Sequence, residues 1–170
     1  MTGWWRSNAI ALGALVVLVP AAALTMSWNE WAEIRQSTAT EPIRVEPGDS
    51  VRYADAVVGP VSAEFTELPL APPDARVVRV TVPVDPGDPA ISCSPFVLKE
   101  MSGAGREWTP RDDLGREWDS DRWTFCDDEA TAPYEVELDY LVPEDASGPF
   151  TVEFGSAGSY PEFVSAVVAP

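Results

Sequence analysis

The first 28 residues constrain the architecture of this 170-residue chain more than any other segment. Ala9 to Met26 is an 18-residue run without a charged side chain. Extending the run to Trp28 gives the roughly 20 residues that a helix needs to cross a bilayer. We therefore predict a transmembrane helix over residues 9–28, preceded by a short stub over residues 1–8.

The residues around this run predict its orientation. Arg6 precedes the run, whereas Glu30, the first acidic residue, follows it. The positive-inside rule then places the N-terminus in the cytoplasm and the rest of the chain outside. Indole rings prefer the headgroup level of a membrane, and tryptophans flank the run on both sides, so we expect interfacial anchors at Trp4, Trp5, Trp28 and Trp31.

A cleaved signal peptide is the alternative to a membrane anchor. The small residues Ala21 to Ala23 fit a cleavage site, and Pro20 could end the helix just before them. The chain would then be secreted rather than anchored. Both interpretations place the downstream domain outside the cytoplasm.

Residues 29–42 are expected to hold the end of the helix and a linker. Ser27 and Glu30 have the spacing of a capping box, which would begin a separate juxtamembrane helix. The alternative is that the transmembrane helix continues for two more turns. The polar stretch from Gln36 to Pro42 predicts a tether, after which the domain occupies residues 43–170.

The charge of the downstream part excludes several functions. All 28 acidic residues lie beyond position 29 against ten basic ones, which leaves a net charge of −18. The negative electrostatic field of such a domain repels the phosphates of nucleic acids, so nucleic acid is excluded as a partner. The chain has no histidine, which excludes Ser-His-Asp and Cys-His catalysis and histidine-containing zinc sites.

Alternating apolar and polar residues predict β-strands throughout the domain. Tyr134 to Val142 alternates strictly, with Glu135, Glu137 and Asp139 on the polar face, and Arg76 to Val84 behaves likewise. Further candidate strands cover residues 51–57, 61–67, 92–99, 150–154 and 163–168. Pro-Gly and Ser-Gly turns separate these runs. The pattern predicts an all-β domain, an antiparallel immunoglobulin-like β-sandwich of seven or eight strands.

Cys93 and Cys126 are the only cysteines. Two lone cysteines outside the cytoplasm are expected to pair, and this disulfide would join the tryptophan-rich segment to the sheets. The chain contains no Cys-x-x-Cys motif, so we expect the bond to be structural rather than redox-active.

Four stretches carry a resemblance to a known group of proteins. They begin at Val82 (VPVDPGDP), Gly105 (GREW), Thr124 (TFCDDEATAPY) and Asp139 (DYLVPEDASGPF). The chain resembles uncharacterised actinobacterial single-pass membrane proteins that have an extracytoplasmic immunoglobulin-like, or telokin-like, β-sandwich. The resemblance implies fold and location, and it transfers no functional residue.

The segment from Gly105 to Glu129 is the strongest candidate for a binding surface. It interleaves tryptophans with carboxylates, the combination that sugar recognition uses, and a cell-wall glycan would suit the compartment. The same carboxylates could bind Ca²⁺, although they do not match an EF-hand and arginines compete for them. The candidate ligand surface comprises Trp108, Asp112, Asp113, Trp118, Asp119, Asp121 and Trp123. Core packing of the tryptophans and turn capping by the aspartates are the structural alternatives.

Catalysis has little support in the sequence. The chain contains neither a dinucleotide-binding loop nor a phosphate-binding P-loop, so no cofactor is expected. No pair of carboxylates stands out as an acid and a base. We therefore expect a non-enzymatic module that binds another protein of the bacterial cell envelope, with a glycan- or calcium-binding domain centred on residues 108–129 as the alternative.

Overall fold

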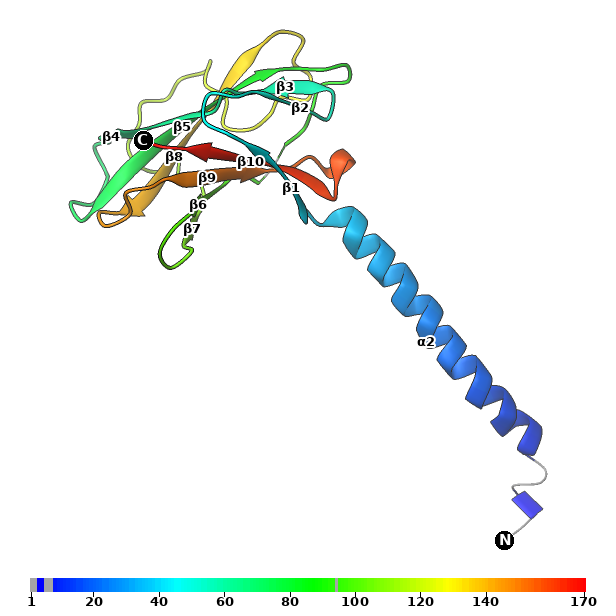
Figure 1. Ribbon diagram of the computed structural model, residues 1–170. Coiled ribbons are helices and arrows are strands. Elements are labelled where there is room, and N and C mark those ends of the chain that lie inside the picture. The colour runs from blue at the N-terminus through cyan, green and yellow to red at the C-terminus, as the bar shows by residue number, and fades with distance from the viewer. Residues whose placement is uncertain (1–2, 5–7, 94) are drawn as a thin grey trace. The chain divides into compact units, whose positions relative to one another are not determined.

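The computed structural model describes residues 3–4, 8–93 and 95–170, without the side chains of Asn29 and residues 32–37. The chain forms two compact units, Met1–Thr38 and Ala39–Pro170 (Figure 1). The first consists mainly of an apolar helix and the second consists mostly of strands. We refer to the second unit as the β domain.

The helix α2 runs from Ala9 to Ser37 and contains Pro20. Its segment Ala9–Trp28 has a mean hydropathy of 2.3, and it is long and apolar enough to cross a membrane. Trp28 and Trp31 are exposed on this helix, whereas Trp5 and Arg6 lie outside the described residues. Since α2 continues past Glu30, the structure contains one long helix rather than a separate juxtamembrane helix.

Five strands form the first sheet in the order β1-β10-β9-β6-β7. The pairing of β1 with β10 is parallel, and the other pairs are antiparallel. The β domain begins slightly earlier than predicted, because the backbone N–H groups of Thr40 and Glu41 both donate to the Pro161 carbonyl. The strands are β1 (Glu41–Val45), β6 (Val97–Glu100), β7 (Glu107–Trp108), β9 (Phe150–Phe154) and β10 (Glu162–Val168).

The second sheet is built around one long strand. β8 pairs with β5 along the whole length of β8, from Pro143 opposite Ala75 to Tyr134 opposite Val84. β3 and β4 pair with different parts of β5, and β2 pairs with β3. The strands are β2 (Val51–Tyr53), β3 (Ala56–Val58), β4 (Ser62–Thr66), β5 (Ala75–Asp85) and β8 (Tyr134–Pro143).

The two sheets share one apolar core. Alternate residues of β5, from Val78 to Val84, are almost completely buried, as expected for a strand with one inward face. They belong to the same buried cluster as Phe150 and Phe154 of β9 in the other sheet. Figure 1 shows the two sheets as two layers.

The described part of the β domain has ten strands rather than seven or eight. The region 51–57, predicted as one strand, forms two short strands joined by a turn. Ala54 and Asp55 occupy this turn with φ values of 48° and 67°. Positive φ at both central residues is the geometry of a tight hairpin whose twist matches its strands.

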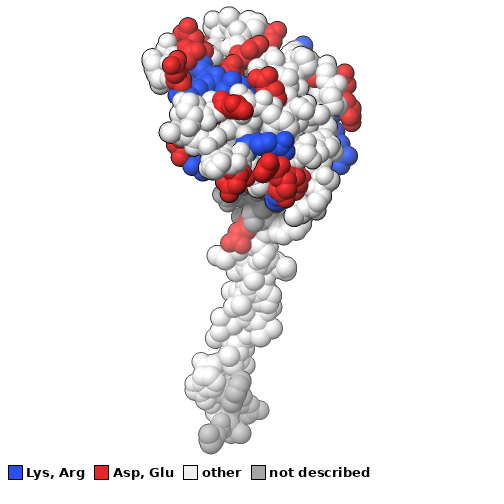
Figure 2. All heavy atoms as spheres, turned by 90° about the vertical axis from the view of Figure 1, so that its left-hand side faces the viewer, with Lys and Arg blue, Asp and Glu red and all other residues white. Residues whose placement is uncertain are grey.

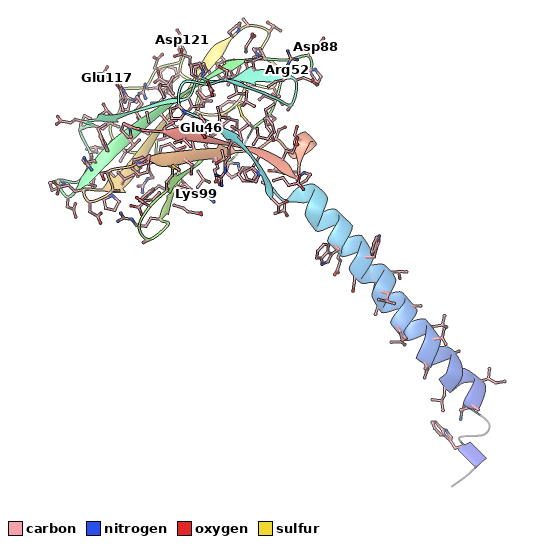
Figure 3. The ribbon with its side chains drawn as sticks, viewed as in Figure 1. Glu46, Arg52, Asp88, Lys99, Glu117 and Asp121 are labelled. Carbon is pink, nitrogen blue, oxygen red and sulfur yellow. A yellow bond between two sulfur atoms is a disulfide. The ribbon has the colours of Figure 1, made fainter. Side chains whose placement is uncertain are left out.

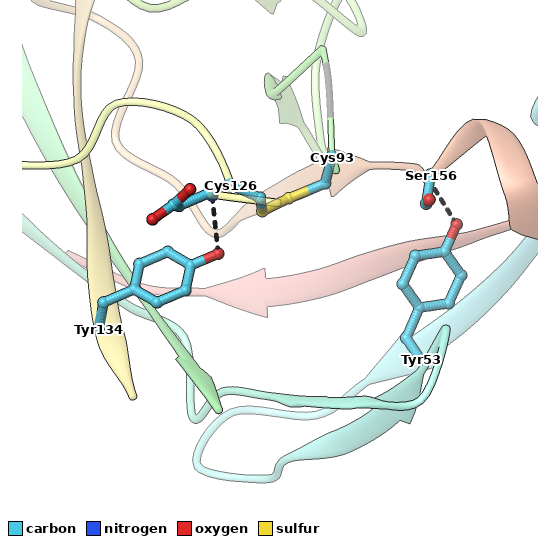
Figure 4. The surroundings of a disulfide bond; sticks show 6 residues. Tyr53, Cys93, Cys126, Tyr134 and Ser156 are labelled. Carbon is cyan, nitrogen blue, oxygen red and sulfur yellow. Dashed lines mark hydrogen bonds between the residues drawn. A yellow bond between two sulfur atoms is a disulfide. The ribbon is translucent and has the colours of Figure 1, made fainter. Parts of the chain in front are cut away.

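Tyr53 connects the two sheets (Figure 4). Its hydroxyl donates to the Glu162 carbonyl at 3.0 Å and accepts from the Ser156 N–H at 2.8 Å. Its ring packs edge-on against Phe154, 6.5 Å between centroids. Burial raises the pKa of Tyr53 above its ordinary value, so the hydroxyl keeps the proton that it donates.

Cys93 and Cys126 form a second connection (Figure 4). Their Cα atoms are 5.2 Å apart, within the range of disulfide-bonded pairs. Cys93 precedes β6 of the first sheet, and Cys126 precedes β8 of the second. The bond therefore ties the segment before β8 to the opposite sheet, and both cysteines are buried in the core.

Two buried tyrosines predict opposite effects of the same substitution. The Tyr140 hydroxyl is buried and has no hydrogen-bond partner among the described residues, whereas the Tyr53 hydroxyl has two. Replacing Tyr140→Phe should raise the free energy of unfolding by about 1 kcal/mol, because an unsatisfied hydroxyl is removed. Replacing Tyr53→Phe should lower it by about 1–3 kcal/mol, because two partners lose their bonds.

Urea unfolding of both variants beside the wild type measures this difference. Because each variant loses one oxygen from a buried ring, the comparison isolates hydrogen bonding from packing. Equal destabilisation in the two variants would contradict the contrast between a paired and an unpaired hydroxyl.

The disulfide should be a major source of stability. Cys93 and Cys126 are separated by 33 positions, and a loop of this size is worth roughly 3–4 kcal/mol by chain entropy. A Cys93→Ala, Cys126→Ala double variant should lose about this much free energy of unfolding. The reduced wild type should unfold at nearly the same urea concentration as the variant, and an unchanged midpoint in both would show that the bond contributes nothing.

Candidate functional site

The segment Gly105–Glu129 passes from one sheet to the other. It contains β7 of the first sheet and then follows the free edge of β8 in the second. The Arg111 N–H donates to the Asp139 carbonyl at 2.8 Å, and the Glu137 N–H donates to the Trp123 carbonyl at 2.8 Å. An uncovered edge strand offers unpaired backbone groups to other chains, so this segment protects β8.

Asp139 holds the segment against the sheet. Although it lies on the polar face of β8, only 5% of it is exposed. Its carboxylate accepts from Arg79 of β5 at 2.9 Å and from Arg116 of the covering segment at 3.1 Å. Arg116 also pairs with Glu137. The sequence predicted that this face of β8 would be in water, and the structure differs because the segment covers it.

Trp108 is part of the scaffold. It lies on β7, opposite Leu98 of β6, and packs edge-on against Phe150 with 5.9 Å between ring centroids. The Arg106 guanidinium carbon lies 5.6 Å from the centre of its indole. The half-buried indole therefore extends the core of the first sheet.

Trp123 belongs to a different aromatic group. Its ring centroid is 5.8 Å from that of Phe125 and 5.9 Å from that of Tyr134. Trp123 and Tyr134 line a shallow cavity of about 340 Å³, together with Asp127 and Glu129. We call these five residues the aromatic–acidic surface.

Trp118 is the most exposed of the three tryptophans, with 86% of its surface accessible. Asp119 and Asp121 lie close to it in sequence, and the Asp119 carboxylate accepts from the Asp121 N–H at 2.9 Å. Figure 3 shows Glu117 and Asp121 on the outside of the β domain, away from Lys99 of β6. The structure therefore keeps Trp108, Trp118 and Trp123 in three different environments.

Two of the four carboxylates of the predicted ligand surface have an ion-pair partner among the described residues. Asp113 pairs with Arg111 at 2.6 Å, and Asp112 lies 3.8 Å from Arg122. The Arg111 guanidinium lowers the pKa of Asp113. Figure 2 shows basic side chains lying against acidic ones over one face of the β domain. Among the described residues, no group of three or more acidic or cysteine side chains could hold a metal ion.

The carboxylates of the aromatic–acidic surface resemble Asp119 and Asp121, and differ from Asp112 and Asp113, in having no ion-pair partner among the described residues. No lysine or arginine follows Arg122 in the sequence, and neither Asp127 nor Glu129 has an ion-pair partner among the described residues. The Asp127 carboxylate accepts from the Glu129 N–H at 3.0 Å, which orders the turn but leaves both charges uncompensated. The surface therefore presents negative charge beside aromatic rings.

Tyr134 positions this turn. Its hydroxyl accepts from the Asp127 N–H at 3.0 Å, next to the disulfide at Cys126 (Figure 4). Burial raises the pKa of Tyr134, and the charges of Asp127 and Asp128 act in the same direction. The ring therefore remains neutral over the physiological pH range.

Comparison with family models, with curated proteins and with solved structures finds no match for this chain. The functional argument therefore depends on the geometry of the chain itself.

The sequence identified part of this surface. It selected Trp123 and placed Asp127 and Glu129 among the carboxylates of the candidate segment 105–129, but it did not select Phe125 or Tyr134 as ligand residues. Tyr134 was assigned to the inward face of its strand, although it is half-buried at the beginning of β8. The sequence nevertheless contains a signal for this surface. No basic residue follows Arg122, so the three consecutive acids that begin at Asp127 have no nearby cation in the sequence.

The Asp139 cluster predicts a large effect of a small substitution. Asp139→Asn should lower the free energy of unfolding by about 3 kcal/mol, because two half-buried guanidinium groups would lose their shared carboxylate. The matched control is Asp113→Asn, which breaks an exposed pair and should cost less than about 1 kcal/mol. Thermal and urea unfolding measure both, and equal effects would show that Asp139 does not hold the segment.

Proposed function

We propose that this chain is a membrane-tethered, extracytoplasmic binding module of a bacterial cell envelope. It displays an immunoglobulin-like β-sandwich outside the cytoplasm and contributes to binding or complex assembly rather than to catalysis. The apolar helix supports the tether, since its length and composition suit a bilayer. The paired cysteines support an oxidising location.

The aromatic–acidic surface is the observation that carries this proposal. Phe125 is 55% exposed and Asp127 and Glu129 have no cationic partner among the described residues. Exposed aromatic side chains contribute most to protein interfaces, and charge complementarity selects the partner. The partner that fits is another envelope protein with a basic segment.

A cell-wall glycan is the second candidate ligand. The exposed Trp118 supports it, because a free indole face can cover the apolar C–H surface of a sugar ring. A calcium site has no such support, since the neighbouring Asp112 and Asp113 face arginines.

Site-specific photo-crosslinking in intact membranes tests the proposal on the full chain. A photoreactive residue at Phe125 should yield an adduct with another protein, whereas the same group at the exposed Arg52 of β2 should not. Asp127→Asn should reduce the Phe125 adduct several-fold, because one attractive charge is lost while the amide oxygen can still accept from the Glu129 N–H. Asp74→Asn removes one charge from a distant loop and is the matched control.

The products distinguish the candidates. A glycan adduct at a photoreactive residue in place of Trp118 would support the second candidate. Equal adducts from Phe125 and Arg52, or no adduct at Phe125, would contradict the proposed surface.

A further inference from the structure

The hairpin that joins β4 to β5 lines a half-open cavity of about 450 Å³. This volume lies within the range of small-molecule sites. About half of its exposed wall is apolar, and the apolar part includes Phe65, Leu68, Pro72 and Pro73. The loop is restrained by its prolines and by backbone bonds from Ala71 to Leu68 and from Leu70 to Leu114, so the cavity is pre-formed.

Among the described residues, Arg76 alone contributes a positive charge to the wall of this cavity. Its Nη2 donates to the carbonyl oxygens of Glu144 and Ala146, both at 2.9 Å. Its guanidinium carbon lies 4.1 Å above the centre of the Phe65 ring. Its Nε is buried and has no hydrogen-bond partner among the described residues. Its Nη1 makes no hydrogen bond within the described chain and remains accessible to solvent.

Arg76 differs from the other half-buried cations of the described chain. Each of the others has a carboxylate partner: Arg79, Lys99, Arg106, Arg116 and Arg122. Arg76 instead contacts two carbonyl groups and an aromatic ring, which orient the guanidinium without neutralising it. A partly buried charge without a counter-ion is costly, so an anion in the cavity would be stabilised.

We propose that this cavity binds a ligand with one carboxylate and an apolar body, and that the carboxylate accepts from Nη1 of Arg76. The planar guanidinium suits a carboxylate, and the apolar part of the wall suits the remainder of the ligand. The net negative charge of the domain repels anions in general. A single charge combined with apolar contacts is therefore favoured over a highly charged anion such as inorganic phosphate. This site is separate from the aromatic–acidic surface and does not depend on it.

Titration of the full chain in nanodiscs with 4-fluorobenzoate, followed by ¹⁹F NMR, tests the proposal. The neutral isostere 4-fluorobenzamide should bind at least about tenfold more weakly, because hydrogen bonds to charged groups are worth about 1.5–3 kcal/mol. Arg76→Gln should weaken benzoate binding by a similar factor and leave amide binding nearly unchanged.

A second variant keeps the test independent of the structural role of Arg76. Glu67 lines the cavity and repels an incoming carboxylate, so Glu67→Gln should tighten benzoate binding two- to fivefold, on the order expected for removing one nearby exposed charge. Glu64→Gln, on the outside of the same hairpin, is the matched control and should change nothing. Equal affinity for benzoate and benzamide, no benzoate binding by the wild type, or no difference between the Glu67 and Glu64 variants would overturn the proposal.

Discussion

The register of β5 with β8 constrains most of the β domain. It sets the inward valines of β5 beside the inward residues of β8, and on the other face it places Arg79 directly opposite Asp139. Because strand side chains alternate, a slip of one residue would turn both sets to the wrong faces. The buried carboxylate then recruits Arg116, and the segment that carries Arg116 covers the edge of β8. The pairing of these two strands thus also determines where a long loop lies.

Sequence patterns predicted the parts of this fold that depend on local alternation. The strands β5, β8 and β9 were recognised because their apolar residues recur with a period of two. The strands β1 and β7 were missed. β1 is short and is defined by pairing with β10, far away in the sequence, and β7 has only two residues, too few to show alternation. The apolar helix was predicted from its length and composition, which require no tertiary information.

The candidate sites show which features of the protein sequence patterns do not predict. Tryptophans that are close in sequence were grouped as one surface, yet Trp108 packs on Phe150 and Trp123 on Tyr134. Their environments depend on contacts between distant segments, which spacing does not reveal. Arg76 illustrates the same limit, because its lack of a carboxylate partner is visible only once the β8–β9 turn is placed beside it.

The uneven distribution of basic residues also affects how the protein can be mapped chemically. Trypsin cleaves after lysine and arginine, so it makes no cut within residues 123–170, which stay together in one long peptide. Cys126 lies in that peptide, whereas Cys93 lies in the peptide bounded by Arg79 and Lys99. Under non-reducing conditions the disulfide holds these two peptides together as one species, which reduction separates. The redox state of the two cysteines can therefore be read by mass spectrometry from a single peptide pair.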